Sequence, residues 1–60
     1  MTREEKILKA IRKNSLTINQ IADKIGEWAS MIEPDVRKLL AEDKIEITAK
    51  FNGKPCFSAK

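Results

Sequence analysis

The sequence has no histidine and only one cysteine, Cys56. A lone cysteine cannot form a disulfide within the chain, and without histidine there is no zinc-ligand set, no Cys/His pair and no Ser/His/Asp triad. These absences argue against an enzyme, a bound metal and a cofactor, and no pattern indicates a small-molecule site. We interpret Cys56 as a small side chain in a strand.

The sequence also lacks a long apolar run. No stretch is long enough to span a membrane, and the charged residues 3–6 stand where a signal peptide would be apolar. We therefore expect a cytoplasmic protein with no membrane partner. The 60 residues are 42% hydrophobic and 35% charged, which suits one small core, so we expect a single domain over residues 1–60.

Charge is distributed unevenly along the chain, whose net charge is +3. Residues 1–13 carry five basic against two acidic side chains, and residues 44–60 carry four against one. Residues 26–43 carry two basic against five acidic side chains. The basic ends favour a nucleic-acid partner, whereas the acidic middle opposes one.

Two capping boxes predict where the first two helices begin. Thr2 pairs with Glu5 three residues on, and Thr17 pairs with Gln20 in the same way. Gly26 stands where a left-handed cap would end the second helix. The apolar stripes of the two helices are Ile7, Leu8, Ala10 and Ile11, then Ile18, Ile21, Ala22 and Ile25. We therefore expect two amphipathic helices, joined by a short extended link at Leu16.

Pro34 complicates the third helix. Its apolar positions are Ile32, Val36, Leu39 and Leu40. Proline inside a helix costs about 3 kcal/mol, which favours a regular helix from Glu33 or Pro34 to about Glu42. Ser30 with Glu33 would form a third capping box and an earlier start. Both starts remain open, with the later one preferred.

A strand and a hairpin follow the helices. Apolar residues alternate with polar ones at Ile45, Ile47 and Ala49, as in a half-buried strand. Asn52-Gly53 is a strong turn signal, but a strict two-residue turn would pair Thr48 with Phe57 and turn the aromatic ring away from the core. We therefore predict a three-residue loop over residues 51–53, with Gly53 left-handed and Phe57 beside Ile47 on the core face.

The order of helix, short extended link, helix, turn, helix and hairpin resembles winged helix-turn-helix domains. Residues 21–26 look like the first helix and turn of the motif, and residues 40–47 resemble the stretch that leads into the wing. Asp43 stands where these families commonly have glycine. The chain is most similar to small stand-alone winged-helix proteins of bacteria and archaea. The resemblance implies an α+β fold, with three helices packed on a small antiparallel sheet and a C-terminal β-hairpin wing.

The resemblance also implies a DNA-binding transcriptional regulator, with the third helix in the major groove and the wing on the adjacent backbone. On the helix, Arg37 is the candidate for a guanine or phosphate, Lys38 for a phosphate, and Ser30 for a further contact. The alternative to DNA contact is that Arg37 and Lys38 form ion pairs along the helix with acidic neighbours, at Glu33, Asp35 and Glu42. Glu33 and Asp35 also oppose groove insertion, because their carboxylates repel phosphates.

The wing supplies the other candidates for DNA contact, Lys50, Asn52 and Lys54. The two lysines flank the turn and would face each other across it, which costs stability unless a phosphate screens them. Lysines at a hairpin tip also serve simply to keep a strand edge soluble. Lys6, Lys9 and Lys13 on the first helix would either extend a basic strip or form an ordinary solvated face.

Trp28 and Met31 motivate an alternative function of a different class. If these side chains are exposed together, with Pro34 shaping the patch, the acidic segment from Trp28 to Asp35 would bind a protein and not DNA. If Trp28 instead folds over the core, it is only a lid. Specific DNA binding by so small a domain would need a homodimer or a protein partner, using the first helix, the wing edge or the Trp28 corner.

Overall fold

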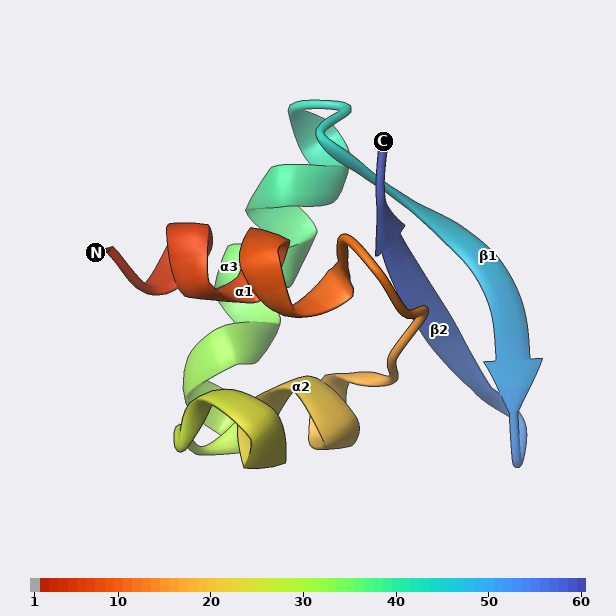
Figure 1. The fold of residues 1–60 in the computed structure, drawn as a ribbon, viewed down its shortest axis with the longest axis horizontal. Helices are drawn as coiled ribbons and strands as arrows, with labels where there is room; N and C mark the ends of the chain where they lie inside the picture. Colours follow the sequence, from red (N-terminus) through yellow and green to blue (C-terminus); the bar gives the residue numbers. More distant parts are fainter. Residues whose placement is uncertain (1) are drawn as a thin grey trace.

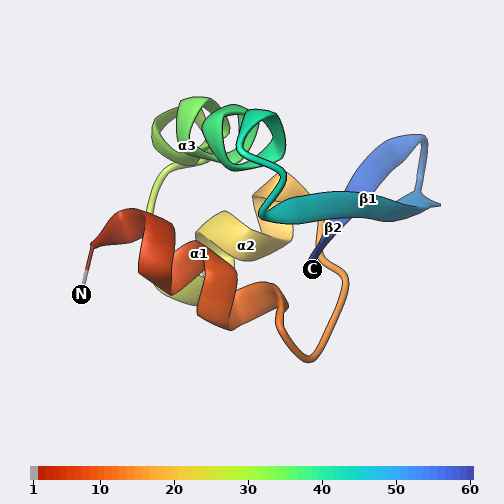
Figure 2. The ribbon, with the colours of Figure 1, turned by 90° about the horizontal axis from the view of Figure 1, so that it is seen from above.

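Three helices precede a two-stranded hairpin in the computed structural model, which describes residues 2–60 (Figure 1). The elements are α1 (Arg3–Ile11), α2 (Ile18–Ile25), α3 (Ala29–Ala41), β1 (Ile45–Phe51) and β2 (Lys54–Ala59). The expected α+β class with a C-terminal antiparallel hairpin is confirmed. Figure 2 shows α1 and α3 along opposite sides of the molecule and the hairpin at one end. No helix within residues 2–60 is long and apolar enough to cross a membrane.

Both expected capping boxes form. The Thr2 hydroxyl accepts from the Glu5 amide at 3.2 Å, and the Glu5 carboxylate accepts from the Thr2 amide at 3.5 Å. At α2 the Gln20 amide donates to the Thr17 hydroxyl at 3.2 Å, and the Gln20 side chain accepts from the Thr17 amide at 3.0 Å. Each box satisfies amides that the first turn of a helix leaves without partners, so both helices begin where the sequence predicts.

Gly26 ends α2 in the left-handed conformation, with φ 74° and its amide bonded to the Ala22 carbonyl. No heavy atom lies within 4 Å of the position that a Cβ would take at Gly26. We predict that Gly26→Ala destabilises the protein by about 1 kcal/mol, because the cost is conformational and not steric. Thermal unfolding should show a midpoint lower by roughly 4–8 °C. An unchanged midpoint would mean that the turn adopts another conformation.

The third helix begins earlier than the preferred prediction. It starts at Ala29 with Trp28 as its N-cap, no side chain caps it, and Pro34 lies inside it. The expected start at Glu33 or Pro34 was therefore wrong, and so was a capping box at Ser30. Ile32 explains the earlier start: its side chain is fully buried, and its amide donates to the Trp28 carbonyl at 3.2 Å. Burial of this first-turn residue offsets the hydrogen bond that Pro34 cannot donate.

The hairpin has the predicted pairing of Ile47 with Phe57, but its turn is shorter than predicted and β1 contains a bulge. Ile47 stands opposite Phe57, as expected, but the closing pair is Phe51 with Lys54, so the turn has two residues and the three-residue loop was wrong. Both turn residues have positive φ, 52° at Asn52 and 77° at Gly53. The register shifts between Ile47 and Ala49, which makes Thr48 a bulge. This extra residue turns Phe57 to the core side without lengthening the loop.

Leu16 forms a short third strand segment beside β2. Its amide donates to the Phe57 carbonyl at 3.0 Å, and the Phe57 amide donates back at 2.8 Å. Nearby, the hydroxyls of Ser15 and Thr48 share a hydrogen bond of 2.6 Å. The predicted extended link therefore also anchors the hairpin to the helices.

One core joins all the elements. Its buried residues are Ile7, Ile11, Ile21, Ala22, Ile32, Val36, Leu39, Ile45 and Phe57. Ile47 is a correction, because its side chain was expected on the core face and is 53% exposed. The free Cys56 is buried in β2. Only the first apolar residue of β1, Ile45, is covered by the helices, so most of the strand extends beyond the core.

Asp43, after α3, adopts a left-handed backbone conformation with a φ of 62°. Aspartate tolerates this left-handed region better than most residues. Its carboxylate accepts a hydrogen bond from the Lys60 ammonium, which raises the pKa of Lys60. This contact lies at the end of the hairpin away from the turn, and it ties the segment after β2 to the end of α3.

Candidate nucleic-acid interface

A shallow cleft joins the hairpin to α2 and α3. It measures about 210 Å³ and is lined by Ile18, Asn19, Ala29, Glu33, Lys54 and Pro55. A second hollow of about 180 Å³ lies between the start of α2 and the hairpin turn, lined by Thr17, Asn19, Gln20, Phe51, Asn52 and Lys54. Asn19 and Lys54 line both hollows. The hairpin turn and the two helices therefore form one continuous surface.

The structure brings Asn52 and Lys54 into this surface but not Lys50. Lys54 stands opposite Phe51, and Lys50 stands opposite Pro55. Because successive side chains of a strand alternate between faces, Lys50 and Lys54 lie on opposite faces of the hairpin. The like-charge pair expected across the turn was therefore wrong. Lys54 lies against the helices, and Lys50 is exposed on the other face.

Arg37 forms an ion pair along α3, as the alternative to DNA contact predicted. Its guanidinium lies 2.6 Å from the Glu33 carboxylate, four residues earlier, and both side chains are largely exposed. Since Glu33 lines the cleft beside Lys54, this pair connects Arg37 to the hairpin surface. Exposed pairs of this kind contribute about 0.3–0.5 kcal/mol, so the guanidinium can exchange Glu33 for another anion at little cost.

Lys38 pairs outside its own helix. Its ammonium lies 3.4 Å from the carboxylate of Glu4 on α1. The expected partners within α3 were Glu33, Asp35 and Glu42, so this prediction was wrong. Lys38 is therefore on the flank of α3 that faces α1. Of the two basic residues predicted on this helix, only Arg37 pairs with a residue that lines the cleft.

Asp35 was expected to repel a phosphate near the cleft, but its carboxylate is paired with a residue of α1. The guanidinium nitrogen Nε of Arg3 donates to the Asp35 carboxylate at 2.6 Å, and the Asp35 side chain is only 21% exposed. This pair holds Asp35 against α1. Glu33 is the remaining exposed acid on the first half of α3, and its charge is shared with Arg37.

Trp28 is exposed and is not a lid over the core. Its side chain is 78% exposed, and Met31 in the next turn is 48% exposed. Pro34 and Ser30 are exposed on the same helix. Trp28 and Met31 are therefore both exposed, as a protein-binding patch requires. The patch begins at the N-terminal end of α3, beside the cleft and not within it.

Sequence reasoning missed two residues of this surface. Asn19 follows the capping box of α2 and lies at the meeting point of both hollows, although nothing in its local pattern distinguishes it from another polar first-turn residue. Phe51 was assigned to a loop, and it is instead the last residue of β1 and 54% exposed. An exposed ring near a hairpin tip can insert between base steps or pack on a sugar.

Lys6, Lys9 and Lys13 do not extend this surface, because they line a separate groove between α1 and α2. Within residues 2–60, no three Cys, Asp or Glu side chains gather where they could hold a metal ion. Comparison with protein-family models, curated proteins and solved structures finds no match for the chain.

Proposed function

We propose that the chain is a winged helix-turn-helix protein that binds DNA and acts as a transcriptional regulator, with α3 in the major groove and the hairpin on the adjacent backbone. The observation that carries this proposal is the continuous surface of the two hollows, which holds Lys54 and Asn52 and is joined to Arg37 by its ion pair with Glu33. The three helices and the C-terminal hairpin are compatible with that fold. Docking of a helix and a wing requires that both lie on one side, and the shared cleft lined by Glu33 of α3 and Lys54 of the hairpin supports this requirement.

The roles of the side chains follow from their positions. Arg37 exchanges Glu33 for a phosphate or for the acceptor edge of guanine. Lys54 and Asn52 contact the backbone beside the groove, and Gly53 leaves room for a close approach. Lys50, on the other face of the hairpin, contributes a longer-range attraction to phosphates. The Glu33 carboxylate, once free, is an acceptor for the amino group of cytosine.

The first test is a salt titration of binding to a mixed-sequence duplex. We expect a dissociation constant on the order of 10⁻⁴ to 10⁻⁶ M and a slope of about −2 in log K against log salt, from contacts by Arg37 and Lys54. In Lys50→Glu/Lys54→Glu the affinity should fall about tenfold or more, and the slope should become shallower by about 1 unit. Fluorescence anisotropy of a labelled duplex measures both quantities.

The matched control is Arg12→Glu/Lys44→Glu, which changes the net charge by the same amount. Both residues are exposed and lie outside the hairpin turn and the cleft. This variant should bind the duplex much more tightly than the hairpin variant. Equal losses in the two variants would reduce the effect to net charge, and no binding by the wild type at low salt would contradict the proposal.

A second function is favoured by the exposure of Trp28. Large apolar side chains exposed next to acidic residues are typical of an anchor for a protein partner, and aromatic residues contribute most to such anchors. Trp28, Met31 and Pro34 would form this anchor. This alternative needs no nucleic acid, so failure of the salt titration would favour it.

A further inference from the structure

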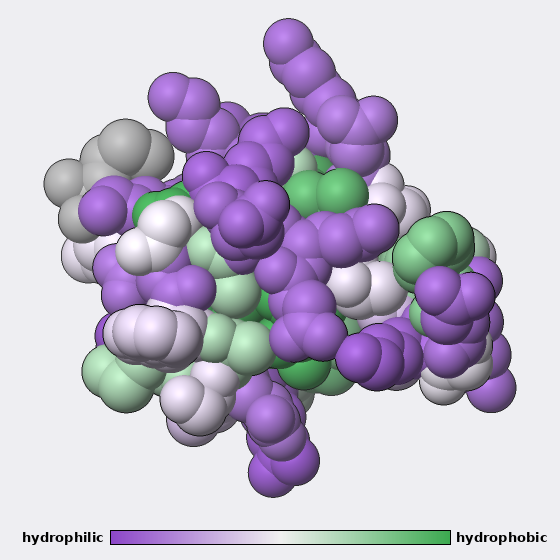
Figure 3. All heavy atoms as spheres, turned by 90° about the horizontal axis from the view of Figure 1, so that it is seen from below, coloured by the Kyte–Doolittle hydropathy of each residue, from purple (hydrophilic) through white to green (hydrophobic). Residues whose placement is uncertain are grey.

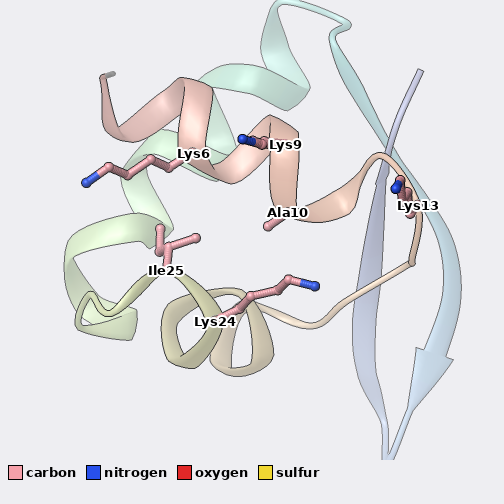
Figure 4. A pocket seen from close by; sticks show the side chains of 6 residues that line it. All are labelled: Lys6, Lys9, Ala10, Lys13, Lys24 and Ile25. Atoms are coloured by element: carbon pink, nitrogen blue, oxygen red, sulfur yellow. The ribbon is translucent and has the colours of Figure 1, made fainter.

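A groove runs between α1 and α2. It measures about 370 Å³ and is lined by Lys6, Lys9, Ala10, Lys13, Lys24 and Ile25. Figure 4 shows Lys6 and Lys9 on α1 and Lys13 in the segment that follows it, with Lys24 and Ile25 of α2 on the other side of Ala10. Figure 3, seen from the α2 side, shows apolar surface in gaps between hydrophilic side chains. The groove therefore has a basic rim and an apolar floor.

The basic rim is not neutralised within the described chain. Lys6, Lys9 and Lys13 recur at the spacing of one helix face, and the lining contains no acidic residue. Among residues 2–60, none of the four lysines forms an ion pair. Four ammonium groups around an apolar floor suit a ligand that brings both carboxylates and a large apolar side chain. A phosphate backbone would satisfy the rim but gain nothing from the floor.

One corner of the same molecule has this complementary chemistry. Trp28 and Met31 are exposed, and Asp23 and Glu27 precede them in the chain. Neither acid forms an ion pair within residues 2–60, whereas Glu33 is paired with Arg37. These four residues, which are close in sequence and which we call the Trp28 corner, thus combine unpaired acids with exposed apolar side chains.

We propose that the groove receives the Trp28 corner of a second copy of this chain, in a reciprocal two-fold dimer. Ile25 of the groove and Trp28 of the corner are three residues apart, so one patch carries both the groove and the side chain that fills it. A two-fold interface requires such self-complementarity, since each copy must offer both halves. Trp28 packs on Ala10 and Ile25 of the other copy, and its acidic neighbours meet the lysine rim.

The size of the molecule sets the strength of this dimer. A standard interface buries about 800 Å² per partner, which is about a fifth of the 4103 Å² that this chain exposes. A chain this small has little surface to spare for an interface, so we expect a weak dimer that depends on its charge pairs. Because added salt screens exposed charges, self-association should weaken as the ionic strength rises. This inference gives a partner to the second function above and is independent of DNA binding.

The experiment is sedimentation equilibrium of the full chain at low salt over a range of concentrations. The wild type should dimerise. Lys9→Glu/Lys13→Glu places acid against acid, and Asp23→Lys/Glu27→Lys places base against base, so each variant alone should dimerise about a hundredfold more weakly. An equal mixture of the two variants should recover dimers, since both halves of the mixed interface then carry opposite charges.

Matched controls separate the docking from net charge and from folding. Arg12→Glu/Lys44→Glu should dimerise much more strongly than Lys9→Glu/Lys13→Glu, and circular dichroism should show that every variant is folded, since the changed side chains are exposed or half-exposed. Trp28 is the sole tryptophan, so its emission should move to shorter wavelength as the wild type dimerises. Trp28→Ala should raise the dissociation constant at least about tenfold.

Three results would overturn the proposal. A wild type that stays monomeric at low salt would leave the groove to an acidic segment of another protein. Dimers that persist equally in both charge-reversed variants would place the interface elsewhere. Loss of dimers in both variants without recovery on mixing would show that the groove and the corner do not meet. A duplex is absent throughout, so none of these results depends on DNA binding.

Discussion

Replacing Phe57 with alanine is expected to leave most of the protein unfolded at room temperature. Phe57 is 3% exposed and belongs to the core, and truncating a buried phenylalanine costs about 3–5 kcal/mol. A domain of this size rarely has more than about 3–5 kcal/mol of total stability. Chemical denaturation followed by far-ultraviolet circular dichroism should therefore show no cooperative transition, or one with a midpoint near zero denaturant.

The large effect follows from the position of Phe57 as well as from its size. The backbone of Phe57 forms hydrogen bonds to Leu16 on one side, and Phe57 stands opposite Ile47 of β1 on the other side. Phe57 therefore lies where the link before α2 meets the hairpin. Phe51→Ala is the matched control, because it removes the same side chain from an exposed position of the same hairpin. Its stability should change by about 0.5 kcal/mol or less. Similar losses in the two variants would contradict the assigned core.

Replacing Pro34 with alanine is expected to stabilise the protein by about 1–2 kcal/mol. Pro34 is the sixth residue of α3, beyond the first turn that tolerates proline, and it cannot donate to the Ser30 carbonyl. Alanine restores that donor, although part of the gain is offset because proline also restricts the unfolded chain. The thermal midpoint should rise by roughly 4–8 °C for each kcal/mol.

Pro34→Gly tests the reason for this gain. Glycine restores the amide but lowers helix stability by about 1 kcal/mol relative to alanine, so the stability should increase in the order proline, glycine, alanine. Pro34 is exposed, so its ring contributes little to the core. A loss of stability in Pro34→Ala would show that the ring packs in a way that the helix needs.

Features fixed by neighbouring residues could be predicted from the sequence. Thr2 and Thr17 cap their helices through bonds to residues three positions on, and Gly26 supplies the left-handed end of α2. Asn52-Gly53 forms a turn in which both residues have positive φ, as this pair favours. All these choices depend on short-range chemistry, which the sequence displays directly.

Features decided by tertiary packing could not be predicted. The start of α3 depends on the burial of Ile32 and not on the local penalty at Pro34. The sequence indicated that Phe57 must face the core, but either a longer loop or a bulge in the strand would achieve this. The structure has the bulge at Thr48, whose hydroxyl bonds to Ser15, 33 residues earlier.

The candidate site shows the same division. Arg37 and Glu33 are four residues apart, so their pair was among the expected alternatives. The pairs of Arg3 with Asp35 and Lys38 with Glu4 join α1 to α3 over more than thirty residues, and no local pattern reveals them. The exposure of Trp28 is equally a property of the folded surface, since its sequence fits a lid and an anchor alike.

The Thr48 bulge also bears on the solubility of the hairpin. Within residues 2–60, β1 pairs with β2 alone, so its outer edge carries free backbone groups next to the exposed Ile47 and Phe51. A flat edge of this composition is a template for fibril growth. The bulge interrupts the regular spacing of donors and acceptors, and Glu46 and Lys50 add charge on either side of it. The residue that turns Phe57 inward thereby also hinders the edge-to-edge stacking of hairpins from different molecules.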